Sequence, residues 1–187
     1  MSTTLIILVI VAVLAIFLVG IYNNLVRLRN TRKEAFANID VVLKQRADLI
    51  PNLVATVKGY AEHEKEVLTK VTEARSAYMN ANTIGEKIQA DNQLTSALAG
   101  LKVSLEAYPD LKANQNFLQL QTELSDMENK LSAVRRRFNM ATREYNNAVE
   151  TFPANLLAGT FGFKKESMYE IPEADRPAME KAPEVKF

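Results

Sequence analysis

The chain has 187 residues, no cysteine and nearly balanced charge, with 23 basic and 22 acidic side chains. A net charge of +1 gives no general attraction for nucleic acid, so we expect no nucleic-acid partner. The lack of cysteine excludes disulfides and the acylated residue of a lipoprotein. Without an apolar N-terminal segment and a polar tail, about 130 residues remain, which suits one domain with a single core.

The stretch from Leu5 to Tyr22 contains no charged residue. As a helix it spans roughly 27 Å, close to the thickness of a bilayer's hydrocarbon core. Asn23 and Asn24 follow it directly, without the small-residue cleavage site of a secretory signal, so we expect a retained transmembrane helix. Basic residues come only after the stretch, at Arg27, Arg29, Arg32 and Lys33. They predict a single-pass protein of the inner membrane, with the N-terminus outside and the rest of the chain cytoplasmic.

Apolar residues then recur at helical spacing through most of the chain. The first helix is predicted to continue straight out of the membrane as far as Pro51, because the proline ring ends or bends a helix. A second helix is predicted from Pro51 to about Tyr78. A fold about Pro51 would bring His63, the only histidine, to the level of Asp40, which favours an imidazole–carboxylate contact.

Two further helices follow. The third is predicted to begin at Thr83-Ile84-Gly85-Glu86, a capping box, and to stop near Tyr108-Pro109. The fourth spans roughly residues 113–151 and carries a regular apolar seam from Phe117 to Phe152, a pattern typical of coiled-coil-like packing.

The sequence therefore predicts an all-α fold, in which an N-terminal transmembrane helix continues into an antiparallel up-and-down four-helix bundle. The alternative is a pair of long hairpins that bury their apolar faces only in an oligomer. The predicted organisation is a short N-terminal tail at 1–4, the transmembrane helix at 5–22, the four-helix domain at 23–163 and a polar, proline-containing tail at 164–187. The tail is too poor in apolar residues to form a core and is expected to be mostly disordered.

Signals for catalysis are missing from the sequence. His63 has no second histidine or cysteine at the spacing of a metal site. No glycine-rich phosphate loop and no nucleophile elbow is present. We therefore predict no catalytic residue, no metal, no cofactor and no enzymatic activity.

Four residues are candidates for interaction. Arg32 and Arg46 occupy positions where the apolar stripe of the first helix predicts hydrophobic residues, so their heads must reach water or find paired carboxylates. They either fix the register of the helices or mark a contact surface. Phe161 and Phe163 follow the fourth helix, which should return to the end of the bundle that carries the anchor. They are expected to cap the bundle, enter the lipid interface or contact a neighbouring subunit.

Several long segments of the sequence are distinctive: Tyr22 to Asn30, Asn38 to Val54, Val57 to Glu64, Ala74-Arg75, Phe152-Pro153, Phe161-Gly162-Phe163 and Ala182 to Phe187. Together they closely resemble the LemA family, and the resemblance covers nearly the whole chain. It implies one membrane helix, a cytoplasmic four-helix domain and no known enzyme activity. A relative in magnetotactic bacteria is associated with forming the magnetosome membrane, and some relatives are encoded near membrane proteases.

We therefore expect a non-enzymatic, membrane-anchored scaffold that self-associates and organises or remodels the bacterial inner membrane. Its expected partners are membrane lipid and further copies of the chain. The alternative is an adaptor for a membrane protease or an envelope-stress system, with a membrane protein as partner and the segment from Met168 to Phe187 as the ligand.

Overall fold

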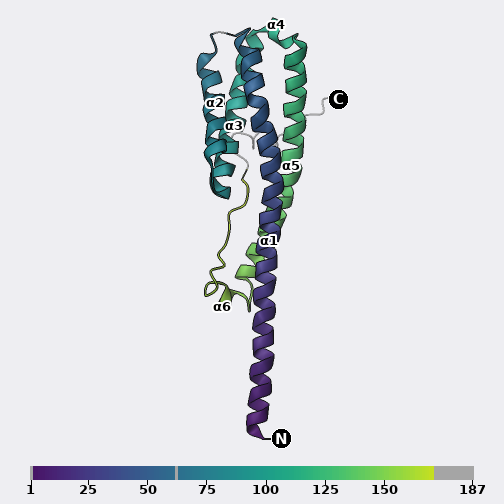
Figure 1. The fold of residues 1–187 in the computed structure, drawn as a ribbon, viewed down its shortest axis with the longest axis vertical. Helices are drawn as coiled ribbons and strands as arrows, with labels where there is room; N and C mark the ends of the chain where they lie inside the picture. Colours follow the sequence, from purple (N-terminus) through teal and green to yellow (C-terminus); the bar gives the residue numbers. More distant parts are fainter. Residues whose placement is uncertain (1, 62, 171–187) are drawn as a thin grey trace, which may run out of the picture. The chain divides into compact units, whose positions relative to one another are not determined.

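The computed structural model describes residues 2–61 and 63–170. These residues form helices and connections, without a strand among them, which confirms the all-α fold class. The elements are α1 (Thr3–Lys58), α2 (Lys65–Asn80), α3 (Ile84–Ser104), the short 3-10 helix η1 (Leu105–Ala107), α4 (Pro109–Lys112), α5 (Gln115–Glu150) and α6 (Asn155–Ala158), as Figure 1 shows. The antiparallel order of a four-helix bundle stays a prediction. Residues 171–187, most of the predicted tail, lie outside the described residues.

The described residues divide into two compact units. Unit 1 contains residues 2–38 and 134–168, and unit 2 contains residues 39–61, 63–133 and 169–170. The long helices α1 and α5 each contribute to both units. Each unit has a core of its own.

In the core of unit 2, each helix contributes apolar residues from one of its faces. Its buried apolar residues come from α1, α2, α3, η1, α4 and α5, and include Ile50, Leu53, Val57, Leu68, Val71, Leu94, Leu101, Leu105, Leu111 and Phe117. α2 and α3 pack against each other and are joined by a short connection (Figure 1). The predicted capping box begins α3: the Thr83 hydroxyl accepts from the Glu86 N–H, and the Glu86 carboxylate accepts from the Thr83 N–H.

The core of unit 1 joins α1, α5 and the segment around α6. Leu25, Tyr145, Ala158 and Phe163 are its buried members. Further along the same two helices, the rings of Phe36 and Phe138 meet edge to face, with their centroids 5.7 Å apart. The segment that follows α5 is therefore packed against the part of α1 that comes directly after the apolar stretch.

The helix α1 continues through Pro51 to Lys58, so the predicted break at Pro51 is wrong. Proline has no N–H, and the carbonyl of Ala47, four residues earlier, therefore loses its helical donor. Arg75 of α2 supplies the missing donor, since its Nε–H binds the Ala47 oxygen at 2.8 Å. Ala47 is fully buried, where an unpaired carbonyl would be costly. A side chain from a neighbouring helix thus completes the hydrogen bonding that the proline interrupts.

The later end of α1 moves the turn between the first two helices. α2 begins at Lys65 rather than at Pro51, and His63 lies exposed in the connection. Because α1 runs about 27 Å beyond Asp40, His63 is carried away from that carboxylate. The predicted contact between His63 and Asp40 is wrong, and Asp40 binds Tyr78 and Lys87 instead.

The role of Arg75 can be tested by a double-mutant cycle with Pro51. Arg75→Met should lower the free energy of unfolding by about 1–3 kcal/mol, because a buried carbonyl loses its donor. In a Pro51→Ala background residue 51 regains an N–H for Ala47, so the same substitution should cost less than about 1 kcal/mol. Denaturant unfolding of the full chain in detergent, followed by circular dichroism, measures the cost of Arg75→Met in each background.

Lys70→Met is the control for this cycle, because Lys70 is an exposed basic residue of the same helix. It should change the free energy of unfolding by less than about 0.5 kcal/mol. An equal cost of Arg75→Met in both backgrounds would show that Arg75 does not compensate for the proline.

Candidate functional site

Arg46 lies inside unit 2 among polar partners. Its Nη1 donates to Asp91 Oδ1 at 2.9 Å and to Thr95 Oγ1 at 3.0 Å, and it lies 3.3 Å from a Glu128 carboxylate oxygen. Asp91 is only 1% exposed, and its other oxygen accepts the hydroxyl of Tyr169, which is also buried. The paired-carboxylate interpretation of Arg46 is therefore correct, and the interpretation in which its head reaches water is wrong.

Arg32 lies in the interior of unit 1. Its Nε donates to Thr142 Oγ1 at 3.2 Å, and its Nη2 donates to the Ser167 carbonyl at 3.3 Å and lies 3.2 Å from the Glu166 carboxylate. The guanidinium carbon stands 4.9 Å above the ring of Phe138. Burial lowers the pKa of this guanidinium and the Glu166 carboxylate opposes that shift, so Arg32 remains a cation. It too is paired rather than exposed to water.

The residues that follow Phe163 are fastened to α5. The Asn146 side chain donates to the Glu166 carbonyl at 2.8 Å and accepts from the Glu166 N–H at 2.9 Å. Lys165 Nζ lies 2.9 Å from the Glu150 carboxylate. The predicted tail begins at residue 164, yet its first residues make specific side-chain and backbone contacts.

Phe161 and Phe163 have different surroundings. Phe163 is 2% exposed and packs with Leu25 and Tyr145, while the Arg29 guanidinium lies 5.0 Å from the centre of its ring. Phe161 is 50% exposed, and its ring meets that of Tyr22 edge to face at 5.2 Å. Phe163 is therefore a core residue of unit 1, as the capping alternative predicts, whereas Phe161 lies at the surface.

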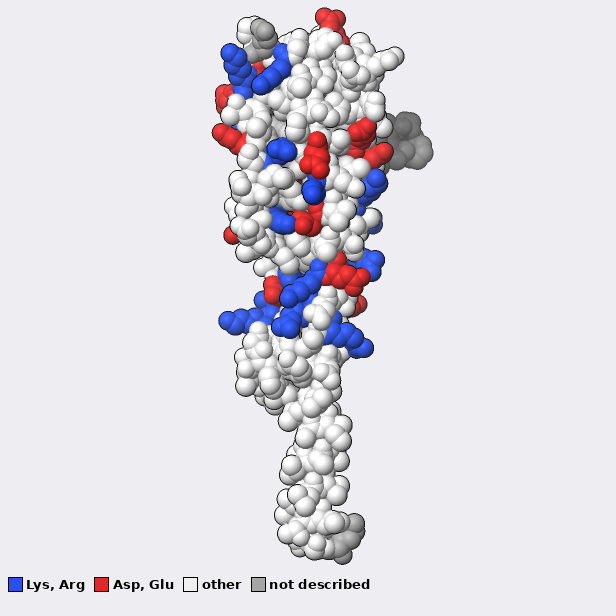
Figure 2. Space-filling model, viewed as in Figure 1, with Lys and Arg blue, Asp and Glu red and all other residues white. Residues whose placement is uncertain are grey.

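Phe161 belongs to a group of exposed apolar side chains in unit 1, which we call the α6 patch. Its members are Tyr22, Phe152, Leu156 and Phe161, which are 40%, 74%, 69% and 50% exposed. Phe152 was predicted to end the buried seam of the fourth helix and is instead the most exposed of the four. No charged residue occurs in 151–163, and the face of the molecule in Figure 2 is white over α6 and over the N-terminal part of α1.

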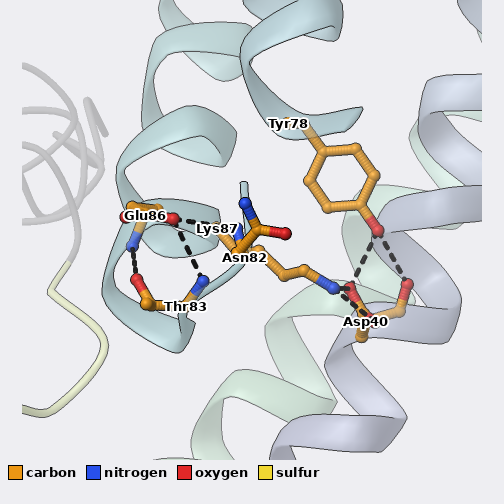
Figure 3. Close-up of polar contacts among 6 residues, drawn as sticks. All are labelled: Asp40, Tyr78, Asn82, Thr83, Glu86 and Lys87. Atoms are coloured by element: carbon orange, nitrogen blue, oxygen red, sulfur yellow. Dashed lines mark hydrogen bonds and ion pairs between the residues drawn. The ribbon is translucent and has the colours of Figure 1, made fainter. Parts of the chain in front are cut away.

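A third polar cluster joins α1, α2 and α3 in unit 2 (Figure 3). The Tyr78 hydroxyl donates to Asp40 Oδ1 at 2.9 Å, and Lys87 Nζ lies 2.7 Å from both carboxylate oxygens of Asp40. Burial, together with the neighbouring Asp40, raises the pKa of the Tyr78 phenol, so it stays a neutral donor. The cluster holds three helices together and leaves no free acid or base for chemistry.

Metal-binding chemistry has little basis in the part of the chain that the structure describes. No three histidine, aspartate or glutamate side chains there gather closely enough to hold a metal ion. His63 lines an open groove with two cations, Lys58 and Lys65, and a single carboxylate, Glu73.

The N-terminal part of α1 is the remaining functional feature. Among the described helices, α1 alone is long and apolar enough to cross a membrane, judged by length and composition. Its most apolar 18-residue window has a mean hydropathy of 3.3, and none of that window is buried within the chain.

Comparison with known proteins identifies the family. The sequence model of the LemA family matches residues 35–187. The chain belongs to the LemA family. The protein LemA of Metamycoplasma hominis is 30% identical over 159 residues, which cover 84% of this chain and 73% of that relative. The magnetosome protein MamQ of Magnetospirillum gryphiswaldense is 26% identical over 183 residues, covering 83% of this chain and 67% of the relative. The magnetosome protein MamQ 2 of Paramagnetospirillum magneticum is 25% identical, with the same coverage.

Sequence reasoning missed two residues of the polar cluster around Arg46 in this LemA-family chain. Asp91 lies three residues before Leu94, on the apolar face of α3, and this misplaced carboxylate could have been matched with the equally misplaced Arg46. Tyr169 gives no such signal, because it follows the last predicted helix and so belongs to no helical face.

The different surroundings of the two phenylalanines predict different effects on stability. Phe163→Ser should lower the free energy of unfolding by at least about 3 kcal/mol, because it removes a buried ring. Phe161→Ser serves as the matched control and should cost less than about 1 kcal/mol, since that ring is half exposed. Thermal unfolding of the full chain in detergent compares them, and similar melting temperatures would contradict the assignment of Phe163 to the core.

Proposed function

We propose that this LemA-family protein is a non-enzymatic scaffold, anchored by one membrane span, that self-associates and organises or remodels the bacterial inner membrane. One observation carries the proposal. The helix α1 contains both an exposed apolar stretch and buried core residues, such as Leu25 of unit 1 and Val57 of unit 2. The same helix is therefore suited to connect lipid with the folded part of the chain.

The exposed stretch of α1 needs a nonpolar environment. Leu8, Val13 and Ile16 are 67%, 60% and 73% exposed, and they lie in a segment without charge. In water such a surface would favour aggregation, whereas the length of the segment matches the hydrocarbon core of a bilayer. Two relatives carry the name magnetosome protein, which agrees with a role at a membrane.

The support for self-association lies in the anchor. Arg32 and Arg46 are buried and paired inside their own units, so they do not offer a surface to a second copy. The contacts between copies are therefore expected along the apolar stretch of α1, because no other part of the chain covers that stretch. Symmetric association is common among proteins of this kind.

The alternative of an adaptor would need the segment from Met168 to Phe187 as its ligand. Tyr169, near the start of this segment, is bound to the buried Asp91, and residues 171–187 lie outside the described residues. Loss of a membrane protein partner on removal of residues 171–187 would favour this alternative.

The orientation in the membrane is the first test. Val103→Cys places a thiol on an exposed position of α3, and Ser2→Cys places one before the apolar stretch. In intact bacteria an impermeant maleimide should label Ser2→Cys, whereas Val103→Cys should react only after the cells are permeabilised, because basic residues stay on the cytoplasmic side. The chain contains no other cysteine to compete. Labelling of Val103→Cys in intact cells would reverse the proposed topology.

Self-association is the second test. Light scattering of the full chain in mild detergent should give a protein mass at least twice the 20.9 kDa of one chain, after subtraction of the bound detergent. A mass of one chain at micromolar concentration would exclude a self-associating scaffold under these conditions. The Phe161→Ser variant should behave like the unchanged chain, since the contacts are expected in the anchor.

A further inference from the structure

The α6 patch lies on a chain segment that has no charge. Phe152, Leu156 and Phe161 are spread over thirteen consecutive uncharged residues, 151–163. Exposed apolar surface that is not interrupted by charge marks sites of contact with a protein or a membrane. The segment is also well fixed, because Ala158 and Phe163 are buried and the Phe163 N–H binds the Ala158 carbonyl at 2.8 Å.

Contacts within unit 1 place this patch beside the end of the apolar stretch. Phe161 and Phe163 both meet Tyr22, at ring centroid distances of 5.2 and 5.7 Å. Ile21 and Val26 pack against the same cluster. Tyr22 is the last residue of the uncharged stretch of α1 and is an aromatic residue of the kind that favours the membrane interface.

The pairing of α1 with α5 agrees with this placement. Three contacts follow one another along the two helices: Phe138 meets Phe36, Thr142 meets Arg32, and Tyr145 packs with Leu25. Later residues of α5 thus meet earlier residues of α1, so the two helices are antiparallel here. α5 ends at Glu150, and Phe152 lies in the turn that follows, at the end of α5 nearest the apolar stretch. Phe152 is thus at the depth at which lipid is expected to begin.

Basic side chains border the patch on the side away from the apolar stretch. Arg27 and Arg29 follow Tyr22 on α1, while Lys164 and Lys165 follow Phe163; of these four, Lys165 is paired with Glu150 within unit 1. The face of the molecule in Figure 2 shows blue side chains bordering the uncharged region that contains α6. An apolar surface next to cations matches the order of acyl chains and anionic headgroups in a bilayer.

We propose that α6 and its flanking residues, 151–163, form a second membrane contact, with Phe152, Leu156 and Phe161 in the lipid interface and the adjacent cations at anionic headgroups. This inference rests on the proposed anchoring of the chain by α1. Lipid is the occupant because Phe161 meets Tyr22, the last residue of the uncharged stretch, and this contact brings the segment to the bilayer surface in every copy. A second copy of the chain would have to displace that lipid.

Single-cysteine labelling can measure the depth of α6 directly. The full chain with Leu156→Cys, labelled with an environment-sensitive fluorophore, is reconstituted into vesicles of phosphatidylcholine and phosphatidylglycerol. Two quenchers are used in separate measurements. Iodide, present on both sides of the vesicles, reports exposure to water, and a lipid with a nitroxide near the top of its acyl chain reports contact with the lipid interface. The label on Leu156→Cys should have blue-shifted emission, lose fluorescence with the nitroxide lipid and resist iodide.

Two control positions make the outcomes distinguishable. Val103→Cys in α3 is the matched control, because Val103 is 73% exposed and Leu156 is 69% exposed; its label should be quenched by iodide and not by the nitroxide lipid. Val13→Cys reports on the anchor. It lies near the middle of the uncharged stretch, so its label should resist iodide and be quenched by a lipid with the nitroxide near the end of its acyl chain. If Val13→Cys fails to do so, the proposed anchoring is wrong.

If Val13→Cys is in lipid while Leu156→Cys is quenched by iodide, α6 is in water and the inference is overturned with the anchor intact. A Leu156→Cys label that resists both quenchers would also overturn it, because a protein surface then covers the patch. Vesicles without phosphatidylglycerol test the role of the cations. Quenching by the nitroxide lipid should weaken there, and an unchanged signal would remove the headgroup contact from the proposal.

Discussion

Continuity of α1 through Pro51 is accompanied by a hydrogen bond from Arg75 to the Ala47 carbonyl, which would otherwise lack a donor. Proline inside a helix removes one backbone donor and disturbs the preceding turn, at a cost of about 3 kcal/mol or more. A charged donor from α2 offsets part of this cost by satisfying the buried carbonyl. Because the helix continues, Leu53 and Val57 join the core of unit 2, against which α2 then packs. The bond and the packing of α2 on this core therefore support each other.

Features that depend on local sequence could be predicted. The uncharged stretch, the capping box at Thr83 and the extent of the fourth helix each follow from residues close together in the chain. The seam of α5 was also readable, since Phe117, Leu131, Phe138 and Tyr145 lie seven or fourteen residues apart along one face and are all buried. Family membership followed from longer segments of the same sequence.

Features that depend on residues far apart in the chain could not be predicted from the sequence. The donor that lets α1 pass through Pro51 comes from Arg75, on another helix, and a proline alone indicates only a break. Phe161 and Phe163 are the same residue type two positions apart, so neither composition nor spacing decides which of them is buried. That decision is made by Leu25 and Tyr145, which approach from two other helices. The Arg46–Asp91 pair is intermediate, because each member was out of place on an apolar face but nothing local joined them.

If the α6 segment enters the lipid interface as proposed, its position beside only one end of the apolar stretch of α1 would make the membrane part of the protein unequal in cross-section. One leaflet would contain a single helix, about 10 Å across, whereas the interface of the other would contain that helix together with the α6 segment. A molecule of this shape would act as a wedge, because it would expand one leaflet more than the other and so favour curvature toward the narrower side. In an assembly of several copies held together by their anchors, the expansion of that leaflet would add up over the copies. A scaffold could then bend a bilayer without any chemical energy, through the difference in the area that it occupies in the two leaflets.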